Sequence, residues 1–86
     1  MAVRAIRMDP KDNVAVVTAD VKASDAVELD DGTRVRASEA VPRGGKVALM
    51  PLAAGATVVR YGETIGLATE DIAAGQHVHT HNLGAS

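Results

Sequence analysis

The sequence predicts an all-β fold of short strands, with one or two single-turn helices between them. Its apolar residues are mostly Val and Ala, Tyr61 is the only aromatic residue, and neither Phe nor Trp occurs. Such small side chains suit thin β-layers better than a helical bundle. Short β-prone runs also alternate with turn signals throughout the chain, which is typical of small barrels and related all-β domains.

A turn motif supports the same fold class. It consists of an apolar residue, two variable residues, a small residue, two more variable residues and then Val. Glycine at the fourth position supplies a positive-φ or close-approach conformation, the apolar residue anchors the turn, and the Val opens a strand. The irregular spacing favours one compact domain over a repeat array. The motif occurs four times, at 21–27, 41–47, 52–58 and 72–78, with Ser24 replacing the glycine in the first copy.

The predicted strands follow in order along the chain. The first covers 13–18. The next two, at 26–29 and 33–36, are joined as a hairpin by an Asp-Gly turn at Asp31 and Gly32. Single helical turns are expected at 38–40, 51–54 and 70–72. We predict one domain over 1–86, with a tail at 84–86. After this hairpin, further strands are expected at 46–49, 57–60, 64–69 and 77–81.

Composition excludes several classes of function. The net charge is −2, acidic and basic residues are interspersed, and aromatic residues for stacking on bases are nearly absent, so nucleic-acid binding is not expected. Without cysteine, the chain can offer no disulfide or thiolate nucleophile, which fits a cytoplasmic protein. The N-terminus lacks a signal-peptide pattern, and no apolar run reaches the length of a membrane span.

All three histidines lie close together near the C-terminus, at alternate positions. On an extended strand His77, His79 and His81 would point to one face, where imidazoles could bind a metal or transfer protons. Asn82 follows them and could bind a substrate hydroxyl or hold an imidazole. The alternative is a polar strand face with no chemical role. Other candidates are weaker: the turn near Arg60 and Glu63 has no catalytic pattern, and Tyr61 is interpreted as a packing residue at the edge of the core.

The segment 71–82 resembles the signature of the SAF domain in the altronate and galactarate dehydratase family. Its most specific part is Gly75-x-His77-Val78-His79-x-His81-Asn82. The segments 61–66 and 10–16 resemble the same family, and the likeness extends from about Met8 to Leu83. It implies a β-clip fold, in agreement with the strand pattern. Ser24 departs from the family, which usually has glycine there.

The resemblance also implies a function. In this family the SAF domain is either the N-terminal part of a long enzyme or a separate small subunit, and this chain looks like the small subunit or an isolated domain. Its partner is a large catalytic chain that removes water from a sugar acid with a divalent metal, often iron. The implied roles are catalysis by His79 and His81, metal binding by His77, His79 and His81, and substrate binding by Asn82. The related sulfolactate sulfo-lyase is the alternative enzyme.

Two further hypotheses remain open. The chain could bind a sugar acid, or dock on a partner, without taking part in catalysis. It could also be an assembly domain that forms a homo-oligomer, as SAF domains do in other families.

Overall fold

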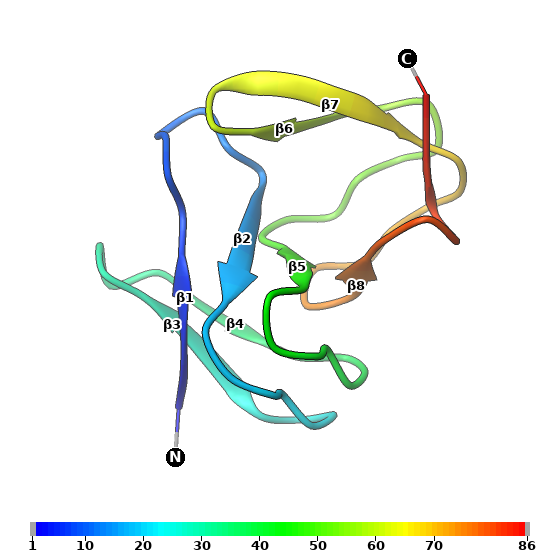
Figure 1. Ribbon diagram of the computed structural model, residues 1–86. Helices are drawn as coiled ribbons and strands as arrows, with labels where there is room; N and C mark the ends of the chain where they lie inside the picture. Colours follow the sequence, from blue (N-terminus) through cyan, green and yellow to red (C-terminus); the bar gives the residue numbers. More distant parts are fainter. Residues whose placement is uncertain (1, 86) are drawn as a thin grey trace.

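A computed structural model describes residues 2–85 of the chain, and this range contains nine short strands and no helix (Figure 1). No helix that could cross a membrane occurs among these residues. The strands are β1 (Val3–Ile6), β2 (Val14–Val17), β3 (Ala26–Leu29), β4 (Arg34–Arg36), β5 (Lys46–Ala48), β6 (Thr57–Arg60), β7 (Glu63–Ala68), β8 (His77–Val78) and β9 (Leu83–Gly84).

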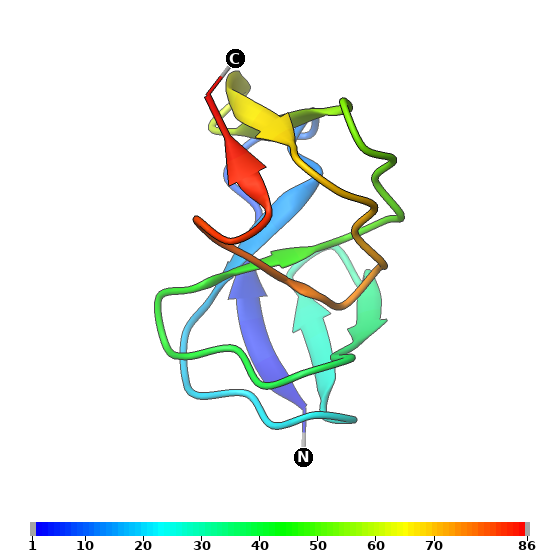
Figure 2. The same ribbon diagram turned by 90° about the vertical axis from the view of Figure 1, so that its right-hand side faces the viewer.

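The strands form two sheets. One has six strands in the order β4-β3-β1-β2-β5-β8, and the other has three in the order β6-β7-β9. Only β1 and β3 pair in parallel, and the other neighbours are antiparallel. The strands β1, β3 and β4 lie toward the N-terminal end of the molecule, and the three-stranded sheet lies at the opposite end (Figures 1 and 2).

The four turn motifs form two symmetric pairs. Their first residues meet in isolated bridges, Val21 with Val41 and Leu52 with Ile72. Every fourth residue has positive φ, at 77° for Ser24, 82° for Gly44, 88° for Gly55 and 85° for Gly75. The valines that end the motifs, Val27, Val47, Val58 and Val78, are all fully buried. The predicted role of the motif, a glycine-type turn that starts a strand, is confirmed at each copy.

Each turn is clamped to the end of a neighbouring strand by two backbone hydrogen bonds. In the third copy the Gly55 N–H donates to the carbonyl of Ala68 at 2.8 Å, and the Ala68 N–H donates to the carbonyl of Ala56 at 2.8 Å. The same pair of bonds occurs in the other three copies. The turn is thus part of the hydrogen-bonded framework, because its backbone groups find partners across the sheet.

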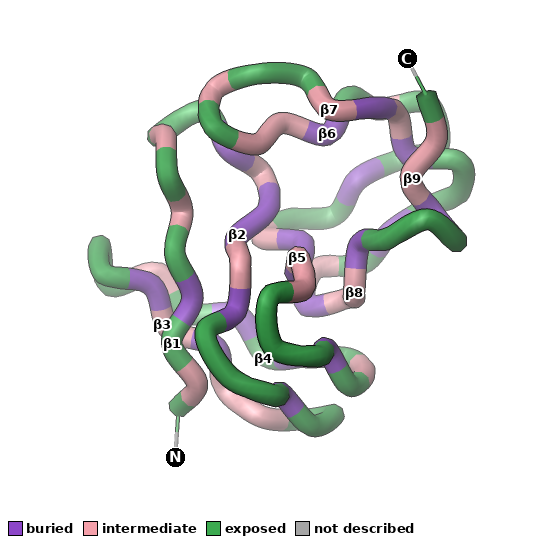
Figure 3. The backbone as a smooth tube through the Cα atoms, viewed as in Figure 1, coloured by how far each residue is buried: buried purple, intermediate pink, exposed green. Residues whose placement is uncertain are grey.

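The apolar side chains form two separate cores, one for each pair of turns. Figure 3 shows that buried stretches of backbone occur in both parts of the molecule. The N-terminal core consists of Val, Ala and Leu, and the C-terminal core also contains Ile, as the Val- and Ala-rich composition predicts. The N-terminal core contains Ala5, Ala15, Val17, Val21, Val27, Leu29, Ala37, Val41 and Val47. The C-terminal core contains Val14, Ala48, Leu52, Val58, Ala68, Ile72 and Val78.

The all-β prediction is confirmed, but three details were wrong. The single helical turns expected at 38–40, 51–54 and 70–72 do not form, since these residues lie in turns and bridges. Strands β1 and β9 were not predicted. Gly84, expected in a tail, pairs with Leu67 in β9, while Ser86 lies outside the described residues.

Candidate functional site

The strand predicted for 77–81 is wrong, because the chain leaves the sheet after Val78. Only His77 and Val78 belong to β8, and residues 79–82 form a turn before β9. The strand ends there because the backbone after Val78 bonds to itself. The N–H groups of Asn82 and Leu83 both donate to the carbonyl of His79, at 3.0 and 2.9 Å. This carbonyl therefore turns into the loop, away from any neighbouring strand.

The side chain of Asn82 is fully buried and closes this turn. Its Oδ1 accepts a hydrogen bond from the His79 N–H, and its Nδ2 donates to the carbonyl of His77, both at 2.9 Å. A buried amide must find partners for both its ends, and the backbone of the two histidines supplies them. Of the roles predicted for Asn82, these contacts favour positioning the histidines over binding a substrate hydroxyl.

The three imidazoles still gather on one side of the molecule, although a turn and not a strand places them. The centroids of the His77 and His79 rings lie 5.4 Å apart, and the rings are parallel to within 5°. The centroids of the His77 and His81 rings lie 5.8 Å apart with a 54° tilt. His77 is half-buried at the centre of this cluster, and His79 and His81 are exposed on either side of it.

Contacts from elsewhere in the chain hold His77. Its N–H donates to Oε2 of Glu39 at 3.0 Å. A Cβ placed on Gly45 would lie 3.1 Å from His77 Nε2, so the ring packs over the second turn, where any larger residue would crowd it. Burial lowers the pKa of His77, and the nearby imidazoles of His79 and His81 lower it further, against an opposing effect of Glu39. These surroundings favour the uncharged form of His77, which acts as a supporting ring in the cluster.

The imidazoles do not form a metal site on their own. Among residues 2–85, no group of three or more His, Asp or Glu side chains is arranged to hold a metal ion. The parallel rings of His77 and His79 explain this, because a metal lies near the plane of each imidazole that binds it, and stacked planes do not meet. The metal expected at His77, His79 and His81 thus does not fit this arrangement, and any such ion would need ligands from another chain.

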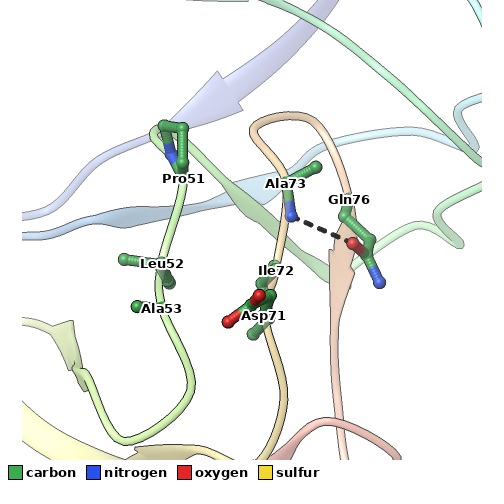
Figure 4. A pocket seen from close by; sticks show the side chains of 7 residues that line it. All are labelled: Pro51, Leu52, Ala53, Asp71, Ile72, Ala73 and Gln76. Carbon is green, nitrogen blue, oxygen red and sulfur yellow. Dashed lines mark hydrogen bonds between the residues drawn. The ribbon is translucent and has the colours of Figure 1, made fainter.

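A shallow groove of about 510 Å³ lies elsewhere, between the third and fourth turns (Figure 4). None of the histidines lines it. Pro51, Leu52 and Ala53 form one side, and Asp71, Ile72, Ala73 and Gln76 form the other. The Gln76 Oε1 accepts a hydrogen bond from the Ala73 N–H at 3.0 Å, so the amide is already engaged in supporting its own turn.

Sequence reasoning missed the residues that position the cluster. Glu39 lies 38 residues from His77 in a loop and gave no signal. Gly45 lies within the second turn motif, and the motif pattern does not show that the His77 ring packs against it. Tyr61, predicted to pack at the edge of the core, is 54% exposed on the β6–β7 turn, with Arg60 over its ring.

Comparison with known proteins agrees with the histidine signature. Residues 3–86 match the model of the altronate/galactarate dehydratase SAF domain. The chain is 48% identical over 77 residues to the altronate dehydratase of Escherichia coli, covering 90% of this chain but 15% of that enzyme. It is 32% identical over 89 residues to the (2R)-sulfolactate sulfo-lyase subunit alpha of Chromohalobacter salexigens, covering 96% of this chain and 95% of that subunit. The chain thus spans a small part of the dehydratases it matches, and nearly all of this subunit.

Proposed function

The chain belongs to the SAF-domain family of the altronate and galactarate dehydratases, and from this we propose that it is a small subunit or accessory domain of a sugar-acid dehydratase. Its relatives support a role beside a separate catalytic part, because similar sequences occur within larger dehydratases and also as a subunit of a sulfo-lyase. In this proposal a large catalytic chain binds most of the substrate, and the present chain brings its histidine turn to the same site in the cytoplasm.

The observation that carries this proposal is the pair of exposed imidazoles on a turn that Asn82 holds rigidly. Loss of water from a sugar acid requires removal of a proton next to the carboxylate and departure of a neighbouring hydroxyl group. Imidazole can accept or donate a proton near neutral pH. His79 and His81 are exposed and can reach a substrate bound on a second protein surface, whereas His77 is half-buried and supports them.

The divalent metal of the proposal, with iron among the candidates, is assigned mainly to the partner. The stacked rings of this chain leave at most one or two imidazoles free to approach such an ion. We therefore derive no chemical step through the metal and base the proposal on proton transfer by His79 and His81.

The test is reconstitution with the large catalytic chain. Dehydration of altronate and galactarate should require the 86-residue chain, and replacing His79 and His81 together by Ala should lower kcat/KM about a hundredfold. Thr80→Ala is the matched control, because it changes an exposed residue of the same turn and removes no imidazole. Full activity of the large chain alone would overturn the proposal.

A sulfolactate sulfo-lyase is the second candidate function, favoured by the match over 95% of a subunit alpha. The same reconstituted enzyme should then release sulfite from sulfolactate and leave both sugar acids unchanged.

A third outcome separates these enzymes from a binding or assembly module. If the histidine variants keep full turnover but dock more weakly on the large chain, the cluster is a contact surface.

A further inference from the structure

Only two polar side chains are buried among the described residues, and each of them holds a turn. Asn82 holds the histidine turn, and Asp12 holds the turn of Tyr61 and Gly62 between β6 and β7. Oδ2 of Asp12 accepts a hydrogen bond from the Tyr61 N–H at 3.0 Å, and Oδ1 accepts one from the Gly62 N–H at 2.8 Å. The Asp9 N–H also donates to Oδ2, at 3.2 Å. Both oxygens of this buried carboxylate therefore serve to fix the β6–β7 turn.

The backbone conformation of this turn is unfavourable for the tyrosine in it. The φ angles are 58° at Tyr61 and 74° at Gly62, as in a two-residue hairpin turn in which both central residues have positive φ. Such turns favour Asn or Gly at the first position, because a bulky side chain crowds its own backbone there. The hairpin would be more stable with asparagine at this position. Local folding therefore does not explain the tyrosine.

Packing of the core does not explain the tyrosine either. Its side chain is 54% exposed, and the guanidinium carbon of Arg60 lies 5.0 Å from the centroid of its ring, which favours a fixed position outside the hairpin. Met8 is 57% exposed and precedes Asp9, whose carboxylate lies against the same turn, since a Cβ on Gly62 would be 2.9 Å from Asp9 Oδ2. Tyr, Met and Arg are enriched where protein interfaces bind most strongly. The hairpin turn thus has the composition of a contact site for another protein.

The β6–β7 turn and the histidine turn lie at opposite ends of β7. The β6–β7 turn directly precedes Glu63, the first residue of β7. Strand β9, which follows the histidine turn, pairs with Leu67 and Ala68 at the other end of β7 (Figures 1 and 3). Because β7 has six residues, its ends are roughly 17 Å apart. A protein bound at Tyr61 would therefore leave the imidazoles free for chemistry.

We propose that Tyr61, with Arg60 and Met8 beside it, is the anchor by which this domain docks on the large catalytic chain. This choice of partner rests on the proposed function. Most of the altronate dehydratase of Escherichia coli lies outside the region that matches this chain, so a large protein surface is available to enclose the ring. A second copy of the chain fits less well, because a symmetric contact at this turn would bring two Arg60 guanidinium groups together. A turn that is fixed before binding also loses little conformational freedom when it docks.

Tyr61→Asn tests the proposal, because folding and docking should respond in opposite directions. Asparagine suits the φ of this position, so the Tm should rise, whereas loss of the ring should weaken docking on the large chain about thirtyfold, measured by calorimetry without substrate. Ser24→Gly is the matched control, since it relieves a positive φ in another turn and should raise the Tm without changing docking. Glu63→Gln is the local control, because it changes an exposed side chain next to the turn and keeps the ring. Docking of Tyr61→Asn with wild-type affinity would overturn the proposal.

Turnover of the reconstituted enzyme separates this proposal from the proposed function. Tyr61→Asn should need about thirtyfold more of the domain for half-maximal activity and then reach the wild-type kcat, because its imidazoles are unchanged. The double Ala variant of His79 and His81 should dock normally and have a low kcat. Full turnover by that double variant, with weak docking of Tyr61→Asn, would overturn the proposed function and leave the anchor standing. If Tyr61→Asn abolishes self-association in sedimentation and leaves docking unchanged, the ring joins two copies of the chain and the anchor proposal is wrong.

Discussion

The N-terminal and C-terminal halves of the molecule are built with the same turns but differ in what they leave unpaired. In each half two turns meet through a bridge, and an aspartate directly before one turn accepts a hydrogen bond from the backbone of the other. Asp20 accepts from the Arg43 N–H and Asp71 accepts from the Ala54 N–H, both at 2.9 Å. This shared construction shows that the turn motif serves the fold and does not by itself indicate a function.

The charged groups distinguish the halves. In the N-terminal half the half-buried Arg7 pairs with Asp31, and the exposed Arg4 and Arg34 both pair with Glu28. In the C-terminal half the half-buried Arg60 forms no ion pair within residues 2–85, and this half also presents the three imidazoles. We infer that the N-terminal half is a scaffold and that the C-terminal half presents the functional groups.

The largest effect should come from the fourth turn, where close packing adds to the positive φ. A Cβ on Gly75 would lie 1.9 Å from the carbonyl oxygen of Arg36, whereas one on Gly44 or Gly55 would meet nothing within 4 Å. Gly75→Ala should therefore lower the free energy of unfolding by at least about 3 kcal/mol. Gly44→Ala and Gly55→Ala should cost about 1 kcal/mol each, from φ alone. Urea unfolding measures all three, and equal losses would show that the three glycine turns are equivalent.

The next effect concerns the amide that holds the histidine turn. Asn82→Ala removes two hydrogen bonds from a fully buried position and should cost about 2–3 kcal/mol. It should also release the rings of His79 and His81, so their NMR signals should move toward those of an unfolded peptide at temperatures where the domain is still folded. Unchanged ring signals in a destabilised variant would mean that Asn82 stabilises the core without positioning the imidazoles.

A stabilising substitution is expected in the N-terminal half. Ser24 is the only one of the four turn residues that is not glycine, and its φ of 77° is unfavourable for a side chain. Ser24→Gly should raise the free energy of unfolding by about 0.5–1 kcal/mol, because relief of this conformation outweighs the greater freedom of glycine in the unfolded chain. Thermal unfolding would show the gain as a higher Tm, and a lower Tm would mean that the serine has a stabilising contact.

The smallest effect is a pH dependence in the C-terminal half. The folded-state pKa of His77 is lowered, so the unfolded state takes up this proton first as the pH falls. The contribution of His77 to stability is therefore complete above about pH 6.5 and is lost as the pH falls toward the folded-state pKa. Urea unfolding measures the free energy of unfolding of the wild type and of His77→Gln at several pH values. As the pH falls, this free energy should decrease more for the wild type than for the variant. A constant difference between the two would contradict the lowered pKa.

Much of the fold was predictable because its signals are local. Short β-prone runs marked β2, β3 and β6, and the Asp31-Gly32 pair marked the β3–β4 turn that the structure contains. The histidine turn was mispredicted although the hydrogen bonds that form it are local, because the alternating pattern does not show them. Alternation of His77, His79 and His81 indicates a strand, and only the burial of Asn82 shows that the chain bends there. The contact between Glu39 and His77 gave no signal at all, since it joins residues 38 positions apart in the sequence.

The central claim is that the C-terminal half carries the catalytic histidines and that the N-terminal half is a scaffold. The kcat/KM of the reconstituted enzyme tests this claim most directly. His79→Ala combined with His81→Ala should keep the Tm and lower kcat/KM about a hundredfold, because both rings are exposed. Ser24→Gly should raise the Tm and leave kcat/KM unchanged. Normal turnover by the double histidine variant, together with a changed rate in Ser24→Gly, would contradict the account.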